Sequence, residues 1–191
     1  MFSQFKRIIT HEIFEPIREL FYSVIFGSNK ITSVYSTEGV LTKTQFLVII
    51  VALSFIYSFF EYFHNSLLTY IAELFLFYAV LTAVQKRCRD FGSSGTFWIL
   101  IVSCAFIGNM AFHFINIETE EFLRDIHKYV FNFQIITFLA LFLIPSKPKP
   151  DLELRSPLLK YPLLYVALCW VLAISATWIV SRYTQTGFTF F

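Results

Sequence analysis

The stretch YPLLYVALCWVLAISATWIVS, residues 161–181, contains no charged residue. A helix needs about 20 apolar residues to cross the hydrocarbon core of a bilayer. Four similar stretches precede it, and together they predict membrane-spanning helices at residues 46–63, 67–84, 97–115, 129–144 and 161–181. Lipid cannot satisfy exposed backbone groups, and the runs lack the alternating pattern of barrel strands. The expected fold class is therefore all-α, a polytopic helical membrane protein.

The composition agrees with this expectation. Hydrophobic residues make up 57% of the chain and charged residues only 15%, whereas a soluble domain carries about 25% charged residues. The net charge of +2 is scattered through the loops, which argues against a nucleic-acid partner. Cys88, Cys104 and Cys169 show no CxxC spacing, so we expect reduced thiols and neither a disulfide framework nor a zinc site.

Lysine and arginine residues collect on one side of the expected spans. That side holds Lys6, Arg7, Arg18, Lys30, Lys43, Lys86, Arg87, Arg89, Lys147, Lys149, Arg155 and Lys160, and the other side holds Arg124, Lys128 and Arg182. The positive-inside rule then places the N-terminus inside and the C-terminus outside. The expected location is a bacterial inner membrane, with an organellar inner membrane as the alternative.

Four regions follow from the pattern. In residues 1–38, apolar residues recur at spacings of three and four between charged ones. This predicts a cytoplasmic amphipathic helix and loop that lies on the inner leaflet, on a partner or on the protein's own loops. A four-span domain at 39–145, a Pro/Lys-rich cytoplasmic loop at 146–160 and a fifth helix with a short tail at 161–191 complete the chain.

The loop between the second and third spans reads KRCRDFGSSG, residues 86–95. The cations near the helix end complement its dipole, and Asp90 is placed to pair with one of them and hold the loop against the bundle. Gly92 can adopt the positive φ that closes a helix, and Ser94 can cap the next helix. The sequence therefore predicts a helix end followed by a rigid turn.

Two interpretations of this loop stay open. Basic residues beside a bilayer attract anionic lipid, and glycines expose backbone N–H groups to an anion. The predicted lipid or anion site consists of Lys86, Arg87, Arg89, Asp90, Gly92, Ser94 and Gly95. The alternative is a topology signal with a structural turn.

The same loop resembles the signature of a large bacterial inner-membrane family, domain of unknown function eight hundred and five. That signature runs roughly Arg-Arg-Leu-His-Asp-x-Gly-x-Ser-Gly-Trp-Trp. Matching residues are Arg87, Asp90, Gly92, Ser94 and Gly95, whereas Lys86, Cys88, Arg89, Thr96 and Phe97 depart from it. A weaker match covers residues 39–47, where only Gly39 is identical. The resemblance spans about residues 39–145 and implies a four-span architecture, with no activity to carry over.

Several polar residues fall within or beside the outer halves of the expected spans. They are Glu61, His64, Glu73, Asn109, His113, Asn132 and Gln134. A carboxylate at mid-bilayer costs about 2.5–3.5 kcal/mol, so Glu73 should face the bundle or a polar cavity. We interpret the group as a candidate pocket for a proton, an ion or a small ligand.

Blander interpretations compete with this pocket. Glu61, His64 and His113 also fit positions at headgroup level. Glu61 and His64 form half of a di-iron motif, but the second copy that such sites need is absent. A mononuclear metal held by Glu61, His64, Glu73 and His113 is conceivable; we expect no metal and no cofactor.

No familiar enzyme motif is present in the sequence. We therefore expect a non-catalytic accessory or interaction subunit of a larger inner-membrane complex, with anionic lipids and other membrane subunits as partners. A small transporter or channel-like protein that uses the cluster around Glu73 is the alternative. A third hypothesis is an enzyme that acts on lipid at the 87–95 loop.

Overall fold

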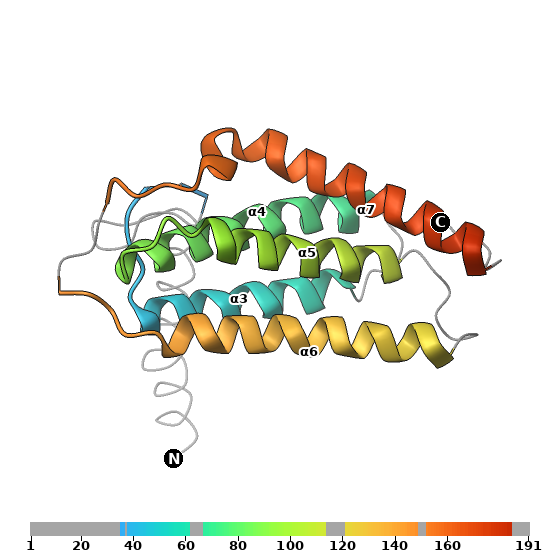
Figure 1. The fold of residues 1–191 in the computed structure, drawn as a ribbon, viewed down its shortest axis with the longest axis horizontal. Helices are drawn as coiled ribbons and strands as arrows, with labels where there is room; N and C mark the ends of the chain where they lie inside the picture. The colour runs from blue at the N-terminus through green and yellow to red at the C-terminus, as the bar shows by residue number, and fades with distance from the viewer. Residues whose placement is uncertain (1–34, 37, 62–66, 114–120, 149–151, 185–191) are drawn as a thin grey trace, which may run out of the picture.

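The computed structural model describes residues 35–36, 38–61, 67–113, 121–148 and 152–184 (Figure 1). The described residues form α3 (Lys43–Glu61), α4 (Leu67–Asp90), α5 (Thr96–His113), α6 (Glu121–Leu143), the 3₁₀ helix η3 (Pro157–Lys160) and α7 (Pro162–Thr184). There is no strand in this part of the chain. The all-α prediction is confirmed for these residues, whereas the predicted N-terminal amphipathic helix lies outside them.

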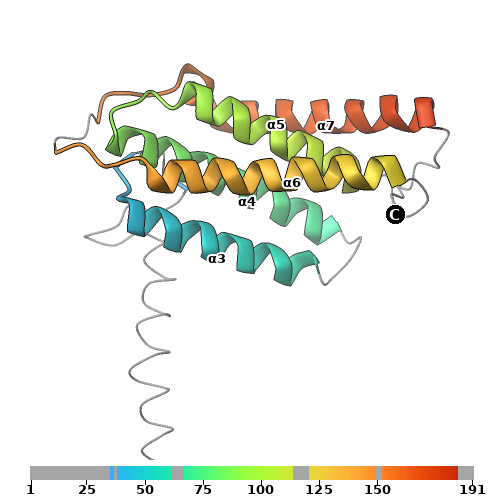
Figure 2. The same cartoon turned by 60° about the horizontal axis from the view of Figure 1, so that its bottom comes forward.

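The helices form an up-and-down bundle along the long axis of the molecule (Figures 1 and 2). α4 lies at its centre, since it packs against α3, α5, α6 and α7. α3 also packs against α6, and α5 packs against both α6 and α7. The starts of α3, α5 and α7 and the ends of α4 and α6 meet at one end of the bundle, which we call the basic end because it carries Lys43, Lys86, Lys147 and Lys160.

Local signals in the sequence set the two helix ends nearest the 86–95 loop. At the start of α3, Thr42 and Gln45 form a capping box, in which Gln45 Oε1 accepts from the Thr42 N–H at 3.0 Å and Thr42 Oγ1 accepts from the Gln45 N–H at 3.4 Å. At the end of α4, Gly92 has a φ of 75°. The Gly92 N–H reaches the Arg89 carbonyl at 3.0 Å and the Ser93 N–H reaches the Cys88 carbonyl at 2.8 Å, which is the Schellman motif.

The core follows the central helix. Phe77 of α4 stacks on Phe106 of α5 with ring centroids 3.7 Å apart. Leu81, Val84 and Cys88 extend the same buried side of α4 toward the basic end. Large apolar side chains are exposed on every long helix; examples are Phe55, Phe75, Phe97, Leu139 and Leu163. The bundle is therefore apolar outside as well as inside.

One described helix is long and apolar enough to cross a membrane by length and composition. It is α7 between Pro162 and Arg182, and only 22% of it is buried inside the bundle. Shorter apolar segments lie at Lys43–Ser58, Thr96–Ala111 and Lys128–Leu143. The structure thus supports a single membrane-spanning helix on these criteria, and the five-span arrangement stays a prediction.

Two helices extend beyond the predicted membrane spans. The fourth helix begins at Glu121, eight residues before the predicted span start at 129, and α4 continues past the predicted span end at 84 to Asp90, next to the turn at Gly92 that was expected to close the helix. In both cases a helix continues past the apolar run into charged residues, such as Asp125 and Lys128, which pair at 3.0 Å. Charge ends a hydrophobic segment, but it does not end a helix. The 3₁₀ helix η3 within the 146–160 loop was not predicted.

Candidate functional site

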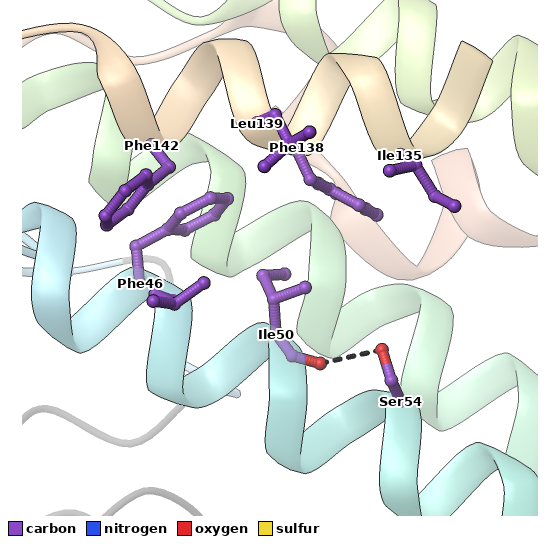
Figure 3. A pocket seen from close by; sticks show the side chains of 8 residues that line it. Phe46, Ile50, Ser54, Ile135, Phe138, Leu139 and Phe142 are labelled. Carbon is purple, nitrogen blue, oxygen red and sulfur yellow. Dashed lines mark hydrogen bonds between the residues drawn. The ribbon is translucent and has the colours of Figure 1, made fainter. Parts of the chain in front are cut away.

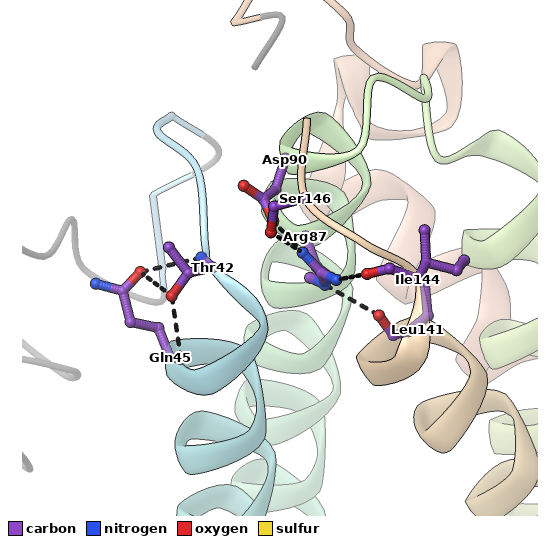
Figure 4. A network of polar contacts seen from close by, with 7 residues as sticks. All are labelled: Thr42, Gln45, Arg87, Asp90, Leu141, Ile144 and Ser146. Atoms are coloured by element: carbon purple, nitrogen blue, oxygen red, sulfur yellow. Dashed lines mark hydrogen bonds and ion pairs between the residues drawn. The ribbon is translucent and has the colours of Figure 1, made fainter. Parts of the chain in front are cut away.

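Arg87 joins the end of α4 to the end of α6 (Figure 4). Its Nε donates to the carbonyl oxygen of Leu141 at 3.0 Å, and another guanidinium nitrogen donates to the carbonyl oxygen of Ile144. The last carbonyls of a helix have no partner within the helix, and Pro145 cannot extend α6 to supply one. Arg87 therefore acts as the C-terminal cap of α6, supplied by another helix.

Asp90 completes this contact. Its carboxylate accepts from the Arg87 guanidinium and from the Ser146 hydroxyl, and its carbonyl oxygen accepts from the Lys147 N–H at 2.8 Å. The predicted pairing of Asp90 with a cation is confirmed, and the cation is Arg87. The loop that Asp90 holds is the segment that follows α6, whereas the prediction concerned the 86–95 loop.

Arg89 and Gln85 tie down two other segments of the basic end. Arg89 Nε donates to the Leu154 carbonyl at 2.7 Å, and its NH1 donates to the Gly39 carbonyl at 3.2 Å. Gln85 donates to the Ser94 carbonyl at 3.1 Å and accepts from the Ser156 N–H at 2.9 Å. Every long loop segment described at this end is therefore fixed to α4.

Burial perturbs the ionisable groups between these contacts. Burial, and then the charge of Arg89, lowers the pKa of Lys86 to about 8. Burial also raises the pKa of the Cys88 thiol to about 12, against the opposing charge of Arg87. Burial lowers the pKa of Arg87 as well, and Asp90 opposes that shift. A guanidinium stays charged under such conditions, so Arg87 and Asp90 form a buried ion pair.

This geometry bears directly on the predicted anion site. The side chains of Lys86, Arg87 and Arg89 are buried, with relative exposures of 0%, 0% and 1%. The guanidinium groups donate to backbone carbonyls and to Asp90, so few donors point outward for a headgroup. The structural interpretation of the loop is therefore favoured, and anion binding by these residues stays a prediction.

The glycines and serines of the loop serve the turn. Gly92 and Gly95 both have positive φ, at 75° and 76°. The hydrogen bonds of the described residues do not include the predicted capping bond from Ser94. The Ser94 hydroxyl is hydrogen-bonded to the Thr96 hydroxyl at 3.3 Å instead. Ser93 is the serine that bonds the backbone here, because its hydroxyl accepts from the Gly95 N–H at 3.2 Å.

The predicted outer-half cluster is brought together only in part. Asn109 of α5 donates to Gln134 of α6 at 2.6 Å. Glu73 is buried at 3% exposure on α4, whereas Asn132 is exposed on α6. The side chains of Glu61 and His113 and the whole of His64 lie outside what the structure describes. Among the described residues, no group of three His, Cys, Asp or Glu side chains is placed to hold a metal ion.

Sequence reasoning missed Gln85, Ser146 and Ser156. Gln85 could have been predicted from its spacing, because it lies four residues before Arg89 and therefore on the same face of α4 as Arg89. Both side chains reach the Leu154 carbonyl. Ser146 and Ser156 gave no signal, since a loop serine carries no mark of the helix that it will contact.

Comparison of the chain with protein-family models, with curated proteins and with solved structures found no match.

Proposed function

We propose that the chain is a polytopic inner-membrane protein in which all five described helices cross the bilayer, and that it works as a non-catalytic accessory or interaction subunit of a larger membrane complex. The observation that carries the membrane placement is the apolar outer surface of the bundle. Phe55, Leu143 and Leu163 are each exposed by more than 70%. Soluble monomers rarely expose contiguous apolar patches beyond a few hundred Å².

The distribution of charge supports the same placement. Residues 44–60, 96–112, 129–143 and 162–181 contain no Asp, Glu, Lys or Arg, and residues 67–85 contain only Glu73. These segments lie side by side within the five helices. Apart from Glu73, the bundle therefore has a middle free of these residues between two charged ends, as a protein immersed in a bilayer requires.

Helix lengths fit the bilayer as well. The five described α-helices contain 18 to 24 residues, which is about 27–36 Å at 1.5 Å per residue. The hydrocarbon core is about 30 Å thick. α4 needs less apolar surface than α7 because the other four helices surround it. We place the basic end, with its excess of lysine and arginine, on the inner side of the membrane.

A subunit role is supported by the contacts of the buried polar side chains and by the exposed apolar faces of the helices. The buried polar side chains at the basic end contact backbone carbonyls and one another, which is the chemistry of a rigid scaffold. The exposed faces of α6 and α7 are apolar and offer lipid-embedded surface to neighbouring helices. The sequence adds 34 residues before the first described residue, with the amphipathic pattern that suits a partner.

The native mass of the protein in the mildest workable detergent or in nanodiscs tests the subunit role. We expect a mass far above 22.4 kDa, with other proteins at fixed stoichiometry. Removal of residues 1–30 should disperse that assembly and leave the bundle folded. A monomer or small homo-oligomer that lacks other proteins would contradict the subunit role.

Glu73 favours a second candidate function, a small transporter or channel-like protein. A carboxyl group buried on the central helix of a membrane bundle is costly, and Glu73 is only 3% exposed. If it moves protons or ions, Glu73→Gln will abolish flux in proteoliposomes and leave assembly intact. Unchanged flux in Glu73→Gln, or no flux in the wild type, would contradict the transporter function and leave the subunit role as the remaining proposal.

A further inference from the structure

A narrow groove of about 180 Å³ lies between α3 and α6. Figure 3 shows Phe46 and Ile50 of α3 facing Phe138 and Phe142 of α6, with Ile135 further along. The rings of Phe46 and Phe138 have centroids 6.4 Å apart. Leu47, Ile135 and Leu139 on its rim are exposed, so the groove opens to the outside of the bundle.

The lining of the groove consists of apolar side chains and one serine whose hydroxyl is already hydrogen-bonded. Ser54 is its only polar side chain, and its hydroxyl donates to the carbonyl oxygen of Ile50 in the same helix at 2.9 Å. No donor is left to orient a polar ligand inside. The groove therefore suits an occupant that makes van der Waals contacts alone.

The dimensions select a single chain over a helix. From Phe46 to Ser54 the groove is about 12 Å long at 1.5 Å per residue, and its cavity volume is only about 180 Å³. Packed carbon atoms lie about 3.5–4.0 Å apart, which is the width of one hydrocarbon chain. A helix with its side chains is about 10–12 Å wide and does not fit.

Charge lies at one end of the groove. Lys43 precedes Leu47 and Ile50 by four and seven residues, so it lies on the same face of α3 at the basic end. Lys147 follows the last turn of α6 at the same end. Both lysines are exposed, and neither belongs to an ion pair between described residues.

We propose that the groove holds one acyl chain of an anionic phospholipid whose headgroup lies at Lys43 and Lys147. This inference rests on the membrane placement proposed above. It assigns the headgroup to exposed lysines and not to the buried cations of the 86–95 loop, although Lys147 Nζ lies beside Gly92 of that loop. Each exposed lysine should contribute about a fivefold preference for the anionic headgroup, which corresponds to the gain of about 1 kcal/mol per basic residue near an anionic surface.

Native mass spectrometry of the full chain tests the site. Phosphatidylglycerol and phosphatidylcholine with the same acyl chains are added in equal amounts to the protein in mild detergent. One variant, Ile135→Trp, fills the groove from an exposed position. A second, Lys43→Gln with Lys147→Gln, removes the charge. Lys160→Gln is the matched control, because Lys160 is an exposed cation of the basic end that lies beside Tyr161, away from the groove.

The wild type and Lys160→Gln should retain one phosphatidylglycerol in preference to phosphatidylcholine. The double lysine variant should lose the preference about 25-fold, the product of the two contributions, and Ile135→Trp should lose both lipids. Equal retention of both lipids by the wild type, unchanged retention by Ile135→Trp, or a second copy of the chain bound in place of lipid would overturn the proposal. Release of the protein from membranes by alkaline carbonate would contradict the membrane placement instead, so the two failures are distinguishable.

Discussion

Arg87 in the last turn of α4 donates from Nε to the carbonyl oxygen of Leu141 in α6, 54 residues further along the chain, at 3.0 Å. One side chain thus closes a helix to which it does not belong. Because Arg87 also pairs with Asp90, its loss leaves the Leu141 and Ile144 carbonyls without this donor and the buried Asp90 carboxylate without its cation.

We expect Arg87→Ala to lower the free energy of unfolding by about 3–5 kcal/mol, the usual cost of leaving a buried charge unpaired. Arg87→Lys should retain only part of the stability that Arg87→Ala loses, since an ammonium group cannot reproduce the forked hydrogen bonds of a guanidinium group. Thermal unfolding of the purified protein measures both. Arg182→Gln is the control, because Arg182 is an exposed cation at the other end of α7. An equal, small effect of Arg87→Ala and Arg182→Gln would rule out the capping role.

Gly92 should be sensitive for two separable reasons. A Cβ at this position would lie 2.5 Å from Lys147 Nζ, and the φ of 75° disfavours any side chain. The left-handed conformation alone costs about 1–2 kcal/mol. We expect Gly92→Ala to destabilise the protein by about that amount, and the added substitution Lys147→Ala to recover little of it, because the flexible end of Lys147 can move away from a Cβ. Full recovery would show that the backbone conformation carries no cost.

Lys86 gives the fold a dependence on pH. Its pKa is lowered from the ordinary 10.5 to about 8, so above pH 8 the folded chain loses a proton that the unfolded chain keeps. Stability therefore rises with pH from about 8. Cys88, whose pKa is raised from 9.0 to about 12, acts in the opposite direction above pH 9, because there the folded chain keeps a proton that the unfolded chain loses.

The expected result is a rise in the free energy of unfolding between about pH 8 and pH 9, followed by a plateau. In a Cys88→Ala background the rise should continue toward pH 10. In Lys86→Met it should be absent. Denaturant titrations at several pH values measure these curves, and a wild-type curve that is flat between pH 8 and pH 9 would contradict the account.

The hydrogen bond of 2.6 Å between Asn109 and Gln134 should couple α5 to α6. A double-mutant cycle with Asn109→Ala and Gln134→Ala should give a coupling of about 0.6 kcal/mol, and at most about 1.7 kcal/mol, as found for such bonds in membrane bundles. Asn132→Ala is the control, since Asn132 is exposed on the same helix. Strictly additive effects of the pair would show that the bond adds no stability.

The sequence predicted the helices well because each apolar run reports directly on a helix. Gly92 ended α4 as expected, and α6 ends at Leu143, just before Pro145, since both residues act through local backbone geometry. The start of α6 was missed because Arg124, Asp125 and Lys128 interrupt the apolar run without breaking the helix. Helix ends that depend on glycine or proline could be predicted from the sequence. The extension of a helix into charged residues beyond its apolar run could not.

The basic end was predicted only in outline. The pairing of Asp90 was expected because three cations lie within four residues of it. The carbonyls that Arg87 and Arg89 reach belong to Leu141, Ile144, Gly39 and Leu154, and no sequence pattern identifies a backbone carbonyl as an acceptor. The distinction between an exposed anion site and a buried set of contacts therefore required the packing of α6 and the loops against α4.

Cys104 provides the most direct test of the membrane placement. It is exposed near the middle of α5, whereas Cys88 and Cys169 are buried. If α5 crosses the bilayer, Cys104 faces lipid, which a membrane-impermeant maleimide does not reach. The measurement is maleimide labelling of the wild-type protein in opened membranes, with Lys160→Cys as the accessible control. We predict labelling of the control alone until the protein is unfolded in detergent, and rapid labelling of Cys104 in native membranes would contradict the account.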